Sequence, residues 1–293
     1  MRLHLVDATY ELFRAFFAPR PPVLATDGRD LTATWGLVEN LLSILRDDGA
    51  THVGAATDRV IESFRNDLYP GYKTGAGVDP RLLAQFPIAE AAIEALGIVL
   101  WPMVAHEADD AIASAVARWA DEPAVEAVLI CSPDKDLAQC VRGERVVLVD
   151  RRRRLTYDQA GVVAKWGVQP GSIPDLLALV GDAADGYPGL PGWGARSAAA
   201  VLFRYGSLDA IPARASDWDV HVRSAVTLAA TLADRRDEVM LYRTLARLRT
   251  DAPLHQTDLE ELRWRGAPRE RWLAFCDEIG LPRLRSRPHR WQD

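Results

Sequence analysis

Short apolar runs alternate with segments of helical periodicity over the first half of the chain, and this alternation constrains the fold more than any other feature. The apolar runs occupy residues 3–6, 51–56, 98–101, 127–131 and 145–149. Residues 32–46 and 107–119 repeat apolar side chains every three or four positions, the spacing of one helix face. Strands that alternate with helices favour a mostly parallel sheet covered by helices. We therefore expect an α/β fold.

The second half of the chain has a different pattern. From about Tyr157 onward strand signals are absent and helical segments dominate, interrupted by a glycine- and proline-rich stretch at residues 181–194. We predict an α/β domain at residues 1–156 and a helical subdomain at residues 157–293, and we assign no role to residues 221–293. Four arginines at residues 151–154 follow the last expected strand. A solvated turn and a phosphate contact are both open interpretations of that tract.

Bulk composition narrows the class of protein. A chain of 293 residues that is 48 % hydrophobic can bury a full core. No apolar run reaches the roughly 20 residues that span a bilayer, so we expect a cytoplasmic protein without a membrane partner. We also expect a monomer. Cys131, Cys140 and Cys276 show no paired spacing, which argues against a zinc site and against a disulfide framework.

Acidic residues recur where the expected strands end or the next helices begin. The carboxyl ends of parallel strands share one edge of a sheet, so side chains placed there converge. Nine carboxylates lie at such positions or in the glycine-rich stretch: Asp7, Asp58, Glu107, Asp109, Asp110, Asp134, Asp136, Asp182 and Asp185. Each alone also suits a helix N-cap or a turn. Together they would repel one another strongly unless cations held them.

Oxygen ligands without histidine or cysteine select hard cations such as Mg²⁺ or Mn²⁺. Two such ions about 4 Å apart activate water and stabilise both oxygens of an in-line phosphoryl displacement. The net charge of −6 argues at first against a nucleic-acid partner. The rest of the chain is net positive, however, once these nine carboxylates are set aside, and bound cations would attract phosphate to them.

Five segments in order resemble the 5′-nuclease domain of bacterial DNA polymerase I and the stand-alone flap endonucleases. They are Leu5-Val6-Asp7-Ala8, residues 57–73, Glu107-Ala108-Asp109-Asp110, Asp134-Lys135-Asp136-Leu137 and residues 181–194. One segment alone is weakly specific, whereas all five in order are strongly specific. The resemblance extends to about Ala213. It implies a PIN-like nuclease core with a mostly parallel central sheet flanked by helices, a helical gateway near residues 64–96 and a helix-three-turn-helix near residues 181–205.

The same resemblance implies a structure-specific 5′ nuclease, a 5′-3′ exonuclease and flap endonuclease that hydrolyses DNA by two-metal catalysis in replication and repair. Asp7, Asp58, Glu107, Asp109 and Asp110 would serve the first ion, and Asp134, Asp136, Asp182 and Asp185 the second. Lys73 and Arg65 match basic residues that contact the scissile phosphate in the family. Tyr72 matches an aromatic residue at the gateway base, where a ring can stack on a terminal base, although a packed tyrosine is an open alternative.

Contacts to DNA with 5′ flaps or free 5′ ends are implied for Gly189, Gly192, Gly194, Arg196 and Ser197, with a K⁺ ion held nearby by backbone carbonyls. Glycines permit tight turns, and N–H groups at the helix start near Ala195 can hold a phosphate without reading sequence. The chain departs from the family pattern at Gly186, where asparagine is usual, and at residues 74–79, which lack an arginine. A PIN-like ribonuclease and a non-catalytic flap-binding protein are the alternatives; the complete carboxylate set and the helix-three-turn-helix favour the DNA nuclease.

Overall fold

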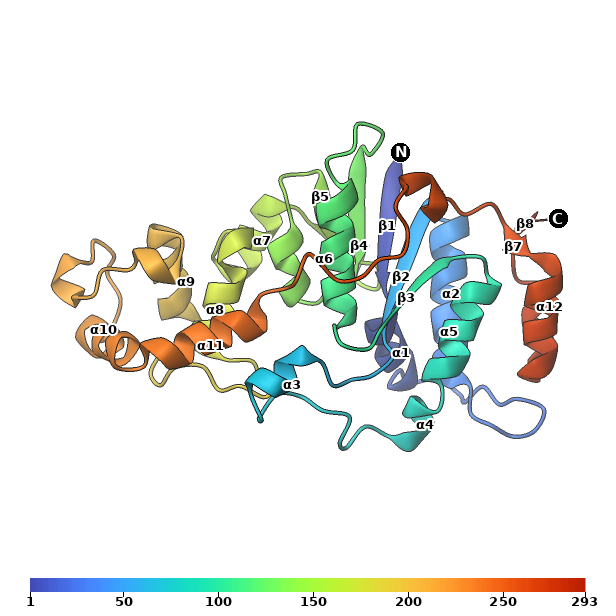
Figure 1. The fold of residues 1–293 in the computed structure, drawn as a ribbon, viewed down its shortest axis with the longest axis horizontal. Coiled ribbons are helices and arrows are strands. Elements are labelled where there is room, and N and C mark those ends of the chain that lie inside the picture. The colour runs from blue at the N-terminus through green and yellow to red at the C-terminus, as the bar shows by residue number, and fades with distance from the viewer. Residues whose placement is uncertain (293) are drawn as a thin grey trace. The chain divides into compact units, whose positions relative to one another are not determined.

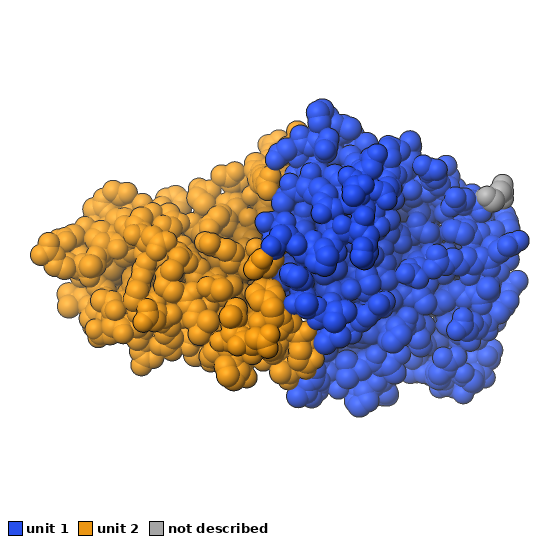
Figure 2. All heavy atoms as spheres, in the orientation of Figure 1, with its two compact units in different colours: residues 1–61, 75–132, 250–293 blue, residues 62–74, 133–249 orange. Residues whose placement is uncertain are grey.

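The computed structural model describes residues 1–292, and the chain divides into two compact units (Figure 2). Unit 1 comprises residues 1–61, 75–132 and 250–293, and unit 2 comprises residues 62–74 and 133–249. This division differs from the boundary expected after residue 156, because residues 133–156 belong to unit 2 and the end of the chain returns to unit 1. No helix of the described residues is long and apolar enough to span a membrane.

A parallel sheet forms the centre of unit 1, with its strands in the order β3-β2-β1-β4. The strands are β1 (Arg2–Asp7), β2 (His52–Asp58), β3 (Val99–Met103) and β4 (Ala127–Cys131). In β1 every residue after the first is buried, and in β2 every residue before the last. Such continuous burial is typical of parallel strands covered on both faces. The four strands expected from the first apolar runs are thus confirmed.

Helices surround this sheet (Figure 1). They are α1 (Ala8–Phe16), α2 (Thr32–Arg46), α4 (Pro80–Leu83), α5 (Phe86–Ala95), α6 (Ala108–Trp119) and α12 (Arg269–Glu278). Helix α6 packs on β1, β2 and β3, while α2 packs against α1 and α5, and α12 packs against α5. The helix expected at residues 32–46 is confirmed, and the one expected at residues 107–119 begins one residue later because Glu107 is its N-cap.

The end of the chain completes the core of unit 1. Trp264 and Trp272 are buried in the same apolar cluster as Leu37 of α2 and Ile93 of α5. The remaining short elements of this part are η5 (Leu259–Leu262), η6 (Pro282–Leu284) and the two-stranded pair β7 (Ala267–Pro268) and β8 (Trp291–Gln292). Of the segment to which the sequence assigned no role, the part from residue 250 onward therefore supplies packing for the α/β unit, while residues 221–249 belong to unit 2.

Unit 2 is mostly helical. Its helices are α3 (Phe64–Leu68), α7 (Gln159–Trp166), α8 (Ile173–Val180), α9 (Ala195–Tyr205), α10 (Ala225–Asp234) and α11 (Arg236–Ala246), with the 3₁₀ segments η1 (Asp136–Cys140), η2 (Pro170–Ser172), η3 (Leu208–Ala210) and η4 (Ala215–Asp217). Helix α8 packs on both α9 and α11. Strands β5 (Val146–Asp150) and β6 (Leu155–Tyr157) form an antiparallel hairpin, and the four arginines make its turn. The sequence did not predict β6, which is short and exposed.

Candidate metal centre

Two carboxylates of unit 1 stand where neighbouring parallel strands end. Asp7 closes β1 and Asp58 closes β2, and the register that pairs Asp7 with Ala56 puts both strand ends at one edge of the sheet. Oδ1 of Asp7 accepts a hydrogen bond from Tyr10 N at 2.8 Å, and its Oδ2 accepts one from Ser132 Oγ at 3.0 Å. The structure thus brings these two predicted ligands to the same edge.

Asp58 also contacts the helix whose start holds three further acidic residues. Its Oδ1 accepts a hydrogen bond from Ala108 N at 2.7 Å. Glu107 is the N-cap of α6, and Oδ2 of Asp110 accepts a hydrogen bond from Glu107 N at 3.0 Å. Glu107 and Asp110 are buried, and Asp109 is half-buried. Helix capping therefore operates here, but it does not explain why several carboxylates are buried together, which is costly without a compensating charge.

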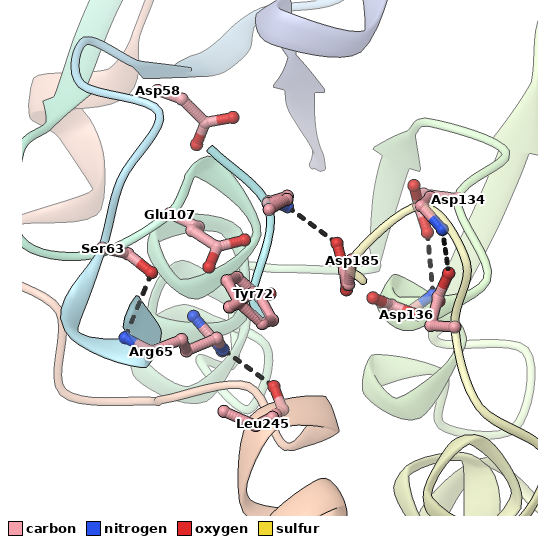
Figure 3. A network of polar contacts seen from close by, with 12 residues as sticks. Asp58, Ser63, Arg65, Tyr72, Glu107, Asp134, Asp136, Asp185 and Leu245 are labelled. Atoms are coloured by element: carbon pink, nitrogen blue, oxygen red, sulfur yellow. Dashed lines mark hydrogen bonds and ion pairs between the residues drawn. The ribbon is translucent and has the colours of Figure 1, made fainter. Parts of the chain in front are cut away.

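Three carboxylates of unit 2 form a compact cluster. Asp136, Asp182 and Asp185 each offer an oxygen, and these oxygens lie within 4.8 Å of one another. Oδ1 of Asp134 accepts a hydrogen bond from Asp136 N at 2.9 Å (Figure 3). Asp182 is 4 % exposed and Asp185 is 6 % exposed. Negative charges this close in a buried place must be protonated or neutralised.

Asp136 shows the electrostatic cost of the cluster. Burial raises the pKa of Asp136 well above its usual range, and the charges of Asp134, Asp185 and Asp182 raise it further, whereas Lys135 lowers it. Within residues 1–292, Oδ1 of Asp136 is buried and has no hydrogen-bond partner. A cation satisfies such an oxygen. Because the cluster offers carboxylate oxygens, the residues present fit a hard divalent ion better than zinc.

Two of the three lysines in the chain contact this cluster. Lys73 Nζ lies 3.1 Å from Oδ1 of Asp185, and Lys73 N donates a hydrogen bond to the carbonyl of Asp185 at 2.9 Å. Lys135 Nζ lies 2.6 Å from Oδ2 of Asp182. The sequence interpretation included Lys73 and missed Lys135, although its position between two predicted ligands was an available signal.

Arg65 and Tyr72 lie inside unit 2. Arg65 is 1 % exposed, and its guanidinium donates from Nε to the carbonyl of Leu245 at 2.8 Å (Figure 3) and from Nη2 to that of Arg247 at 3.2 Å. These bonds join α3 to the end of α11. Tyr72 is 3 % exposed, with Lys73 Nζ 5.6 Å from the centre of its ring, so the packed-tyrosine alternative describes it. Burial disfavours direct contact of either side chain with DNA, and those roles stay predictions.

The glycine-rich stretch makes a tight reversal between α8 and α9. Gly181 and Gly189 have φ values of 82° and 69°, and a Cβ on either would lie within 2.3 Å of the opposing backbone. Only glycine fits both positions. Gly186 has φ 86°, and a Cβ there would lie 2.2 Å from the carbonyl oxygen of Gly71. The absence of the usual asparagine at Gly186 is thus explained by the close approach of the chain that carries Lys73.

Helix α9 begins directly after this reversal. Gly194 is its N-cap and supplies no side-chain oxygen, so the first N–H groups of the helix are not capped by that residue. Arg196 is exposed and Ser197 is half-buried in the first turn, and Gly192 has φ 85° in the preceding loop. The positive end of a helix beside an arginine suits a phosphate group.

Two family models match the chain. Residues 2–167 match the 5′-3′ exonuclease N-terminal resolvase-like domain, and residues 168–270 match the 5′-3′ exonuclease C-terminal SAM fold. DNA polymerase I of Rhizobium leguminosarum is 37 % identical over 268 residues, which cover 89 % of this chain and 26 % of that protein. DNA polymerase I of Mycobacterium leprae is 33 % identical over 290 residues, which cover 97 % of this chain and 31 % of that protein. The chain spans between a quarter and a third of the length of these relatives.

Solved structures share the fold. T5 5′-exonuclease with bound divalent zinc ions superposes with a TM-score of 0.66 at 16 % identity, over 95 % of this chain and 98 % of that chain. The catalytic core of Rad2 in complex with a DNA substrate superposes with a TM-score of 0.60 at 15 % identity, over 95 % of this chain and 87 % of that chain. The expected PIN-like core with a mostly parallel sheet, followed by a helical part, is confirmed.

Proposed function

This chain belongs to the 5′-3′ exonuclease family, and from that membership we propose that it is a structure-specific 5′ nuclease acting on DNA as a 5′-3′ exonuclease and flap endonuclease. The observation that carries the proposal is the cluster of Asp136, Asp182 and Asp185, in which one buried oxygen of Asp136 has no hydrogen-bond partner among residues 1–292. Relatives named DNA polymerase I and the DNA substrate of the Rad2 complex support DNA as the substrate class.

The nine carboxylates serve two divalent ions, Mg²⁺ or Mn²⁺, in this proposal. Asp7, Asp58, Glu107, Asp109 and Asp110 hold the first, and Asp134, Asp136, Asp182 and Asp185 hold the second. When bound, such ions activate water and stabilise the charge that develops on the phosphate oxygens. The chain orients its ligands in advance through backbone donors: Tyr10 N holds Asp7, and Ala108 N holds Asp58.

Lys73 is the residue that acts on the phosphate. Its ammonium lies beside Asp185, within reach of a phosphate oxygen held at the cluster, and a lysine there donates a hydrogen bond to the charge that grows in the transition state. Arg65 contributes by position, because its bonds to the end of α11 hold the segment that leads to Tyr72 and Lys73.

In this proposal the start of α9 binds DNA at a distance from the phosphodiester that is cleaved. Gly192 and Gly194 are exposed and let the backbone approach a phosphate closely, and Arg196 and Ser197 add a positive charge and a hydroxyl. Gly189 is buried against Gly181, so it contributes by shaping the turn. A K⁺ ion bound to carbonyls of this loop would add to the same attraction. These contacts carry no base information, so we propose that the enzyme selects 5′ flaps and free 5′ ends by shape. We further propose that it works as a monomer in the cytoplasm, in replication and repair.

The test is incubation with Mg²⁺ or Mn²⁺ on end-labelled flap DNA, single-stranded DNA and RNA of matching sequence. We expect short products from the 5′ strand of the DNA substrates, no cleavage in EDTA and no cleavage by the Asp185→Asn variant. Faster cleavage of the RNA would favour the ribonuclease alternative. Tight flap binding without cleavage in either metal would favour the binding-only alternative, and both results would contradict the proposal.

A further inference from the structure

A pocket of about 430 Å³ opens in unit 1 beside the end of β2. Ile61 from the segment after β2, Leu83 from α4 and Phe86 from α5 form its apolar wall, and Asp58 and Arg59 also line it. This volume is in the range of small-ligand sites. The pocket therefore joins an apolar surface to one of the carboxylates assigned to the first ion.

The other charged groups of the pocket are paired with one another or with neighbours. Glu90 is 6 % exposed; its Oε1 accepts a hydrogen bond from Thr57 Oγ1 at 2.7 Å, and its Oε2 accepts bonds from Arg59 Nε at 2.9 Å and Nη2 at 2.6 Å. Glu94 pairs with Arg271 at 2.8 Å. Because these charges are compensated within the protein, the pocket favours a neutral ligand over a charged one.

Arg59 gives the pocket a flat polar surface, whereas Phe86, which is 5 % exposed, contributes only a small part of its ring to the apolar wall. The two-point contact with Glu90 fixes the plane of the Arg59 guanidinium, whose side chain is 50 % exposed, and uses only part of its five N–H groups. The ring of Phe86 is held edge-on against Phe13, with ring centres 6.2 Å apart at 85°. A planar, exposed guanidinium is a group on which nucleobases stack.

We propose that this pocket binds one unpaired nucleobase of the strand that carries the 5′ end. A base is flat and neutral with a polar rim, so it matches an apolar wall beside a fixed arginine donor. A base seated here would leave its sugar-phosphate backbone next to Asp58, where the proposed hydrolysis takes place. The inference rests on the proposed function and adds to it a subsite for a single nucleotide.

The experiment combines a pocket-filling variant with substrates that lack one base. Ala91 is exposed and lines the pocket, so Ala91→Trp fills it; Ala117→Trp, at an exposed position of α6 outside the pocket, is the matched control. Flap DNAs carry an abasic residue at the first, second or third unpaired nucleotide. Binding is measured by fluorescence anisotropy in Ca²⁺, and cleavage by single-turnover rates in Mg²⁺.

For wild type and Ala117→Trp, we expect one abasic position to weaken binding roughly fivefold or more, the effect of losing one stacked base. Ala91→Trp should bind the intact flap as weakly as the abasic one, because its pocket admits no base. A 2-aminopurine at that position should change its fluorescence on binding wild type and not on binding Ala91→Trp. Leu83→Ser, which removes part of the apolar wall without adding bulk, serves if Ala91→Trp does not fold.

The experiment distinguishes failure of the proposed nuclease function from failure of the pocket proposal. If wild type does not cut flap DNA in either metal, the proposed function fails. If wild type cuts, but no abasic position changes binding, or if Ala91→Trp and Leu83→Ser respond to base removal as Ala117→Trp does, the pocket proposal is wrong while the nuclease proposal stands.

Discussion

Lys135 places its ammonium 2.6 Å from Oδ2 of Asp182, so a lysine that lies in sequence between Asp134 and Asp136 neutralises a carboxylate of the cluster. Burial lowers the pKa of Lys135, but the hydrogen bond to Asp182 and the charges of Asp136, Asp182 and Asp134 outweigh it and raise that pKa above its usual range. The lysine is therefore charged at neutral pH and acts as an internal counter-ion for carboxylates that also suit a divalent ion.

Replacing this lysine should change stability and metal affinity in opposite directions. Lys135→Met removes a positive charge from the cluster, so we expect a lower melting temperature than wild type in EDTA and tighter binding of Mg²⁺ or Mn²⁺. Lys165→Met, at an exposed lysine of α7, is the control. Calorimetric metal titration and melting curves measure both effects. An unchanged metal affinity together with an unchanged melting temperature in EDTA would contradict the prediction.

Neutralising a ligand should separate catalysis from DNA binding. We expect Asp134→Asn and Asp185→Asn to abolish cleavage and to leave flap binding measurable, because one lost carboxylate disrupts an ion without removing the phosphate contacts that we propose for α9. Single-turnover rates measure cleavage, and fluorescence anisotropy in Ca²⁺ measures flap binding. A variant that keeps near wild-type turnover would count decisively against the assignment.

Replacement of Lys73 should impair cleavage, whereas replacement of Arg196 should impair DNA binding. Lys73→Ala should slow single-turnover cleavage by orders of magnitude at saturating enzyme, since we propose that the charge of Lys73 acts in the transition state. Arg196→Ala should mainly weaken duplex binding and lower the salt dependence of that binding by about one phosphate contact. Rates at saturating enzyme and binding over a salt series are the measurements. Equal losses of rate in both variants would remove the distinction.

The raised pKa of Asp136 predicts how stability depends on pH in EDTA. The folded protein holds the Asp136 proton to higher pH than the unfolded chain does, so the free energy of unfolding should fall as pH rises from the usual aspartate pKa through the raised folded value. The slope from one such group is at most about 1.4 kcal/mol per pH unit. Asp136→Asn should remove this slope and melt higher than wild type at neutral pH in EDTA. A variant that melts lower there would show that protein hydrogen bonds already stabilise the charged carboxylate.

Because Arg65 is buried, its replacement should lower the stability of the protein. A direct contact with the scissile phosphate, the role expected from the sequence, predicts no such loss. Arg65→Met should destabilise the protein by about 2 kcal/mol or more, because two backbone carbonyls lose a charged donor inside unit 2. At temperatures where the variant is folded, the single-turnover rate should drop far less than in Lys73→Ala. Urea unfolding and single-turnover kinetics make the comparison. A stable but inactive Arg65→Met would restore the direct phosphate role.

The sequence predicted the four strands of unit 1 because buried parallel strands are short apolar runs, and here these runs alternate with segments of helical spacing. It did not predict β6, which is only three residues long and has no buried residue to give an alternating pattern. Nor did it predict that Trp264 and Trp272 complete the core of unit 1. An apolar aromatic residue signals burial, but nothing in its local sequence says against which distant element it packs.

For the candidate site, the strand-end positions of the carboxylates were sufficient to bring Asp7 and Asp58 to one edge and to select Asp136. Asp182 and Asp185 were selected from the glycine-rich stretch, which follows a helix. The sequence did not show which of the basic and aromatic side chains are exposed to solvent. The sequence does not distinguish an arginine that faces solvent, as Arg196 does, from one that is buried and bonded to backbone carbonyls, as Arg65 is. The motifs therefore predicted the kinds of residue, while the contacts of Arg65 and Tyr72 depend on packing that the local sequence does not specify, such as that of Arg65 on the end of α11.

The return of the chain to unit 1 has a consequence for biosynthesis. Residues that complete the core around α2 and α5 lie in α12 and its flanks, the last part of the described chain to be made. As the polypeptide leaves the ribosome, the first strands and helices emerge before the residues that cover them. Part of their apolar surface stays uncovered until unit 2 and then residues 264–284 have emerged. The interval between translation of α5 and translation of α12 is thus the period in which the nascent protein is most exposed to aggregation, and a chaperone that binds apolar surface would act in that interval.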